Sequence, residues 1–167
     1  MLKFATLAKK LSENYIEAGC DEVGRGCLCG PVVAAAVILD ENFNNNLIND
    51  SKKLSFKLRN ELDQFIKDNV VDYAITELPP SFIDEHNILN ASIYAMHQSL
   101  DKLTTRPELI LVDGNKFHPY NFIPHECIIK GDSKFLSIAC ASILAKNYRD
   151  NLLIVLHEQF PVSGLDI

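Results

Sequence analysis

The sequence predicts an α/β fold in which helices flank a mixed β-sheet. Two apolar stretches, 16–21 and 32–40, are separated by a turn rich in glycine and proline, which is typical of two antiparallel strands. A third stretch, 71–77, alternates between polar and apolar residues as a strand does. Later strands alternate with segments of helical spacing. This order favours a mixed sheet over a purely parallel sheet built from βαβ units.

The elements after the first two strands can be justified in order. A polar, Asn-rich stretch, 41–50, predicts a loop. Ser55 is a suitable N-cap for the helix that follows. The apolar face of that helix would contain four residues at helical spacing: Leu58, Leu62, Phe65 and Ile66. Pro79-Pro80 would then end the third strand, because proline has no backbone N–H to donate to a neighbouring strand.

The second half of the chain alternates between helices and short strands. One or two helices are expected over 83–103. A fully apolar strand, 109–112, stops at Asp113, and another short strand is expected over 127–130. The segment 134–159 has the pattern of a long helix that is rich in small residues.

The composition is that of an ordinary globular protein. The chain has 167 residues, which is enough for one domain with a proper core. No apolar run reaches the roughly 18 residues that a membrane span needs, and the N-terminus lacks the pattern of a signal peptide. We therefore expect a cytoplasmic protein that does not bind membranes.

The net charge and the cysteines give information about the ligands and the compartment of the protein. A net charge of −6 argues against binding of bulk polyanions, unless the acids surround bound cations that reverse the local field. Two groups of basic residues are expected on solvated helix faces: Lys52, Lys53, Lys57 and Arg59, and Lys130, Lys134, Lys146 and Arg149. Five cysteines without a C-x-x-C unit indicate core thiols in a reducing compartment rather than disulfides or a zinc site.

The segment that carries most chemical information contains Asp21, Glu22, Gly24, Arg25 and Gly26. Adjacent carboxylates at the end of a strand are costly unless a cation holds them, because their charges repel and burial penalises both. Magnesium is a suitable cation, since it prefers carboxylate oxygens. The Gly-Arg-Gly element offers backbone groups that can approach a ligand closely and a guanidinium that can meet a phosphate. The segment therefore predicts a metal site beside a phosphate site.

Two further acids could join this site. Asp113 ends an apolar strand, where sites of α/β sheets gather, although an Asp-Gly turn has the same pattern. Asp132 precedes the long helix and could equally be its N-cap. Phosphoryl transfer with two metal ions requires about this number of acids. The sequence contains no Ser-His-Asp pattern, no Walker A loop and no GxGxxG motif.

The chain closely resembles bacterial ribonuclease HII from about Glu17 to Phe160. The resemblance rests on a series of blocks in family order: Asp21-Glu22-Val23-Gly24-Arg25-Gly26, Gly30-Pro31-Val32-Val33-Ala34-Ala35-Ala36-Val37, Asp50-Ser51-Lys52-Lys53-Leu54-Ser55, Ile83-Asp84-Glu85-His86-Asn87-Ile88-Leu89, Val112-Asp113-Gly114-Asn115, Lys130-Gly131-Asp132-Ser133-Lys134, Leu136-Ser137-Ile138-Ala139, Ala141-Ser142-Ile143-Leu144-Ala145-Lys146 and Arg149-Asp150. It implies one catalytic domain over 1–167 with an RNase H-like fold, a mixed five-stranded sheet flanked by helices.

The resemblance also implies an activity and its substrates. The family hydrolyses the RNA of RNA–DNA hybrids and incises 5′ to single ribonucleotides in duplex DNA, as ribonucleotide excision repair requires. Its products carry 3′-hydroxyl and 5′-phosphate ends. Four acids would hold two Mn²⁺ or Mg²⁺ ions: Asp21, Glu22, Asp113 and Asp132. The element that senses the ribose 2′-hydroxyl would be Gly24, Arg25 and Gly26. Backbone phosphates would meet Ser51 and Lys52, with Lys53 as a further candidate.

The end of the chain departs from the family pattern. The family continues with a Lys-Gly-Tyr segment whose tyrosine stacks on the deoxyribose beside the scissile ribonucleotide, whereas no tyrosine follows Tyr148 here. We expect a short or truncated C-terminal segment and weaker discrimination for single ribonucleotides. A replication clamp could bind through a tail beyond this segment, and the protein is expected to be a monomer.

Three alternatives stay open from the sequence. The first is a nuclease of the same fold that acts on all-DNA junctions, against which the Gly-Arg-Gly element argues. The second is a catalytically impaired domain that binds RNA–DNA hybrids without cutting them, because the C-terminal segment is missing. The third is an α/β domain with scattered acids, which would require the family blocks to occur by chance.

Overall fold

The computed structural model describes residues 6–26 and 30–160. Its sheet has the strand order β3-β2-β1-β4-β5. The strands are β1 (Glu17–Val23), β2 (Val32–Ile38), β3 (Asp72–Leu78), β4 (Leu109–Asp113) and β5 (His125–Ile128). β2 pairs antiparallel with β1 and β3, while β4 pairs parallel with β1 and β5. The predicted mixed sheet is confirmed, including its antiparallel first pair.

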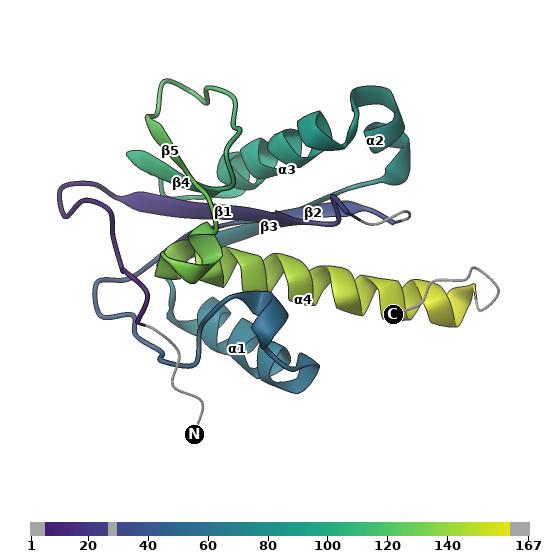
Figure 1. Ribbon diagram of the computed structural model, residues 1–167, viewed down its shortest axis with the longest axis horizontal. Coiled ribbons are helices and arrows are strands. Elements are labelled where there is room, and N and C mark those ends of the chain that lie inside the picture. Colours follow the sequence, from purple (N-terminus) through teal and green to yellow (C-terminus); the bar gives the residue numbers. More distant parts are fainter. Residues whose placement is uncertain (1–5, 27–29, 161–167) are drawn as a thin grey trace.

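Helices cover both faces of this sheet (Figure 1). The helices are α1 (Phe56–Asn69), α2 (Pro80–His86), α3 (Ile88–Lys102) and α4 (Leu136–Gln159), with two short 3₁₀ turns, η1 (Ser51–Lys53) and η2 (Gly131–Ser133). One face packs against α2 and α3, and the other packs against α1 and α4. The strand β2 lies between β3 and β1 and is buried along its whole length, which explains why its sequence is continuously apolar.

Local signals set most of the boundaries. The Ser55 hydroxyl accepts a hydrogen bond from the Leu58 N–H at 3.2 Å and begins α1 as predicted. The segment 83–103 contains parts of two helices rather than one. They separate at Asn87, whose φ is 63° and whose side chain accepts from the Asn90 N–H at 3.0 Å. β3 ends at Leu78, directly before Pro79, as predicted. Pro80 occupies the first turn of α2, where its missing N–H costs nothing.

Several boundaries differ from the prediction. β1 continues to Val23 instead of ending at 21, and β2 ends at Ile38 instead of 40. β5 spans 125–128 rather than 127–130, because Lys130 adopts a left-handed conformation with a φ of 56° that ends the strand. β5 is also an edge strand, so its polar first residues need no apolar environment. The long helix begins at Leu136 rather than at 134, because 131–133 form η2 instead. Asp132 therefore does not cap the long helix.

Three cysteines in the described part of the chain are free thiols. Cys20 and Cys140 are buried and Cys127 is half-buried, in agreement with the prediction of core residues. Cys27 and Cys29 lie outside the described residues. Across 6–26 and 30–160, none of the helices has the length and apolar character that a membrane crossing requires.

The contact between β1 and α4 depends on Gly19. A Cβ added to Gly19 would lie 2.5 Å from the Ile138 backbone nitrogen and would also collide with the Ser137 carbonyl carbon. We expect Gly19→Ala to destabilise the protein by about 2–3 kcal/mol, since backbone atoms cannot move aside easily. Thermal unfolding should show a melting temperature about 4–10 °C lower. Gly26→Ala is the matched control, because nothing lies within 4 Å of its added Cβ, and equal melting temperatures would contradict the expectation.

Candidate active site

The parallel pairing of β1 with β4 brings acidic residues to one edge of the sheet. Cys20 pairs with Val112, so the next residues along the two strands are Asp21 and Asp113. Cys20 and Val112 belong to the core on the α3 side. Because side chains alternate along a strand, Asp21 and Asp113 face the α4 side.

Asp21 is a carboxylate in an unfavourable environment. Its residue is only 5% exposed. Burial raises the pKa of Asp21 well above its ordinary value, and the charges of Glu22 and Asp113 raise it further. Hydrogen bonds from the Ser142 hydroxyl and from the Glu22 N–H, the latter at 2.7 Å, oppose this shift. A cation bound beside Asp21 would offset the cost of burying its ionised form.

Glu22 lies one position further along β1, which continues to Val23 instead of ending at the two acids. Its side chain therefore faces away from that of Asp21. Its Oε1 accepts from Arg25 Nη1 at 3.1 Å, whereas its Oε2 is buried and has no hydrogen-bond partner. Burial raises the pKa of Glu22, Arg25 lowers it, and Asp113 raises it again. One oxygen of this carboxylate is thus left to accept a donor or a cation.

Asp113 and Asp132 connect β4 with η2. Asp113 Oδ1 accepts a hydrogen bond from the Gly131 N–H at 2.6 Å. Asp132, which follows Gly131 in the sequence, is 8% exposed. Burial raises the pKa of Asp132 to about 6, with further contributions from Asp50 and Asp113, while Lys52 opposes the shift. The structure therefore places four like-charged side chains at neighbouring positions around the ends of β1 and β4.

These acids fit divalent cations by charge and by donor type. Carboxylate oxygens are what Mg²⁺ and Mn²⁺ accept, and Glu22 Oε2 is a buried oxygen without a partner. Within residues 6–26 and 30–160, however, no three His, Cys, Asp or Glu side chains converge on one position that could hold an ion. Two of the carboxylates instead accept hydrogen bonds from the protein: Glu22 accepts from the Arg25 side chain, and Asp113 accepts from the Gly131 N–H. Cation binding would require these side chains to reorient.

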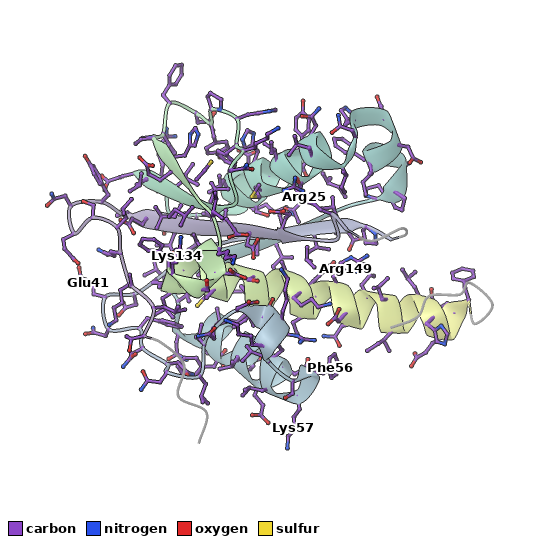
Figure 2. All side chains as sticks on the ribbon, in the orientation of Figure 1. Arg25, Glu41, Phe56, Lys57, Lys134 and Arg149 are labelled. Atoms are coloured by element: carbon purple, nitrogen blue, oxygen red, sulfur yellow. The ribbon has the colours of Figure 1, made fainter. Side chains whose placement is uncertain are left out.

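The Gly-Arg-Gly element borders the acids. Gly24 has a φ of 107°, and a Cβ on it would lie 2.7 Å from the Pro31 carbonyl oxygen, so glycine is required there. Arg149 of α4 donates from Nε to the same oxygen at 3.0 Å and so links Pro31 to α4. Gly26 is open, with nothing within 4 Å of an added Cβ. Figure 2 shows Arg149 between α4 and the sheet.

The two predicted phosphate ligands differ in their surroundings. Ser51 is 4% exposed, and its hydroxyl is 2.9 Å from the Ser142 hydroxyl. Lys52 is exposed and near enough to Asp132 to lower the pKa of that carboxyl. The side chain of Lys52 is therefore available to a ligand, whereas the side chain of Ser51 is used within the protein.

Sequence reasoning missed two residues of this region. Asp50 caps η1 by accepting from the Lys52 N–H at 3.0 Å, and it raises the pKa of Asp132. An aspartate directly before a short polar turn is the signal that could have revealed it. Ser142 contacts both Asp21 and Ser51, but a serine in an Ala-rich helix gives no such signal.

The expectation of solvated basic groups was wrong for two members. Arg59 is 8% exposed and Arg149 is 3% exposed. Each is buried because it holds backbone carbonyl oxygens: Arg59 binds those of Ser51 and Leu54, and Arg149 binds that of Pro31. Such long-range acceptors cannot be read from a local pattern of charge.

Comparison with known proteins agrees with this geometry. The family model of ribonuclease HII matches residues 18–167. The ribonuclease HII of Bacteroides fragilis is 56% identical over 151 residues, which cover 90% of this chain and 75% of the relative. That of Christiangramia forsetii is 58% identical over 144 residues, which cover 86% and 73%.

The fold is similar to that of solved ribonuclease structures. The crystal structure of ribonuclease H2 from Pyrococcus horikoshii superposes with a TM-score of 0.79 at 27% identity, covering 89% of this chain and 79% of that one. This likeness confirms the RNase H-like sheet that the resemblance implied. The chain belongs to the ribonuclease HII family and is thus a hydrolase, an endoribonuclease of the ribonuclease H type that acts on RNA–DNA hybrids.

Proposed function

We propose that this enzyme also incises duplex DNA on the 5′ side of a single ribonucleotide, using two divalent metal ions and leaving 3′-hydroxyl and 5′-phosphate ends. The observation that supports this proposal is the gathering of four acids beside the Gly-Arg-Gly element. Burial and neighbouring carboxylates raise the pKa values of three of these acids, Asp21, Glu22 and Asp132, and bound cations would offset both effects.

The four acids would hold the ions: Asp21, Glu22, Asp113 and Asp132. When bound, Mn²⁺ or Mg²⁺ would lower the pKa of the attacking water and would stabilise the negative charge that develops on the leaving 3′-oxygen. The protein fixes parts of this site beforehand. The Gly131 N–H orients the Asp113 carboxylate at 2.6 Å, and the Ser142 hydroxyl supports Asp21. Reorientation of Glu22 would free Arg25 to meet the substrate, because the two now form an ion pair.

Substrate recognition would use backbone features of the nucleic acid. Gly26 leaves open space beside its main chain, so a ribose can approach it and expose its 2′-hydroxyl to backbone groups. Lys52 would meet a phosphate, which positions the duplex without reading its sequence. We therefore propose no base specificity and a strong dependence of binding on salt.

We further propose that residues 1–167 form one catalytic domain that works as a cytoplasmic monomer in ribonucleotide excision. The alternative of an impaired hybrid-binding domain finds no support, because the chain has all four acids and their charges influence one another. The all-DNA junction nuclease is disfavoured by the open Gly26 and by membership of the family.

The deciding experiment is cleavage of a labelled DNA duplex that carries one ribonucleotide, in Mg²⁺ and in Mn²⁺. A uniform RNA–DNA hybrid and an all-DNA junction duplex are the comparison substrates. We expect incision 5′ to the ribonucleotide and no cutting of the junction duplex. Cleavage of the hybrid alone would refute recognition of single ribonucleotides, and binding of the hybrid without any cleavage would favour the impaired domain.

A further inference from the structure

The position of η1, which carries Lys52, depends on one buried guanidinium. A turn of three residues makes too few internal hydrogen bonds to fix its own position. Arg59 of α1 donates from Nη1 to the backbone oxygens of Leu54 at 2.9 Å and of Ser51 at 3.3 Å. These oxygens lie at the two ends of the turn. Arg59 therefore holds the segment on both sides of Lys52.

Arg59 is in turn anchored to α4. Its Nη2 donates to Asp150 Oδ2 at 2.7 Å, and Asp150 Oδ1 accepts from Lys146 Nζ at 2.7 Å. Arg59 is 8% exposed and Asp150 is 7% exposed, so this pair is shielded from water and salt. The planar guanidinium can donate hydrogen bonds to η1 and to α4 at the same time, which an ammonium group cannot do with the same geometry.

A second attachment joins the same elements. The Ser51 hydroxyl lies 2.9 Å from the Ser142 hydroxyl, and both residues are buried. Ser142, Lys146 and Asp150 are spaced by four residues, so they share one face of α4. This face holds η1 and also carries the hydroxyl that hydrogen-bonds Asp21. The loop with Lys52 and the acidic edge are thus fixed to one rigid helix.

We propose that Arg59 and Asp150 are positioning residues, which hold η1 so that Lys52 meets a backbone phosphate of the hybrid while the scissile bond lies at the acids. This inference rests on the proposed phosphate contact of Lys52. Neither positioning residue needs to touch the nucleic acid, because both act through the main chain of η1. Their loss weakens capture of the substrate and leaves the chemistry at the acids intact.

The test is steady-state cleavage of an RNA–DNA hybrid by Arg59→Met, with folding checked by thermal unfolding. We expect KM to rise about tenfold and kcat to stay within about twofold. The slope of log KM against log salt should fall by about 0.9, the value of one phosphate contact. Lys67→Met is the matched control, since it removes a 2.7 Å ion pair with buried Asp63 within α1 itself. It should lower the melting temperature without changing KM.

Lys52→Met separates the two ways in which the proposal can fail. A normal KM in Lys52→Met would refute the phosphate contact itself. A raised KM in Lys52→Met with a normal KM in folded Arg59→Met would refute the positioning role alone. If both roles hold, Arg59→Met adds less than about twofold on the Lys52→Met background, because the two changes remove the same contact. Should Arg59→Met not fold, Asp150→Asn, which keeps the shape and an acceptor oxygen, replaces it under the same criteria.

Discussion

Replacing Asp113 with asparagine should reduce kcat for hybrid cleavage by about 10³-fold, a size typical of losing one centrally placed electrostatic group. Asparagine keeps the Oδ1 that accepts from the Gly131 N–H at 2.6 Å, so the link between β4 and η2 should survive. What disappears is the charge that raises the pKa values of Asp21, Glu22 and Asp132. The measurement is kcat at saturating hybrid in Mg²⁺ and in Mn²⁺.

The same variant should be slightly more stable than the parent when metal is removed with EDTA, because one like charge leaves a crowded site. Asp68→Asn is a suitable control, since Asp68 is an exposed carboxylate that hydrogen-bonds Gln64 on α1. It makes the same chemical change far from the acids. Equal kcat values for Asp113→Asn and Asp68→Asn would remove Asp113 from the proposed site.

The sequence was most informative where a local pattern has a physical cause. The continuous apolar run of β2 indicated a buried strand, and the hydroxyl of Ser55 marked the start of α1. β5 was misplaced by two residues because an edge strand tolerates polar side chains, which weakens its pattern. The start of α4 was misplaced because Lys130 and η2 depend on contacts with β4 that no local pattern contains.

The same distinction applies to the site. The four acids of the proposed site could be named because carboxylates at strand ends, and the family blocks around them, are visible in the sequence. That Asp21 and Glu22 face opposite sides of the sheet follows from the continuation of β1 to Val23, which the sequence left open. Ser142 and Arg59 hold the site through contacts across the fold, to Ser51 and to Asp150, so only the structure reveals them. Asp50 acts locally, and its position before a short polar turn is a signal in the sequence.

Removing divalent metal should make the stability of the protein fall as the pH rises from about 4 to 7. Burial and neighbouring charges raise the pKa of Asp132 to about 6 and raise those of Asp21 and Glu22. In this window the unfolded chain has lost protons that the folded protein keeps, so the free energy of unfolding decreases with pH. Below about pH 4, near the ordinary carboxyl pKa, this destabilisation is absent. His97 acts in the opposite direction, because its pKa is lowered.

Melting temperatures measured in EDTA between pH 5 and 7.5 test this expectation, with Asp132→Asn compared at each pH so that His97 and other groups cancel. The variant should lose a large part of the decline that the parent shows. At pH 7.5, Mn²⁺ at about 100 times its dissociation constant should add about 2.7 kcal/mol, which corresponds to about 5–10 °C, and the gain should be smaller in Asp132→Asn. The expectation would be contradicted if the stability of the parent protein changed neither with pH nor with Mn²⁺. The carboxylates at this edge would then neither repel one another nor bind a cation.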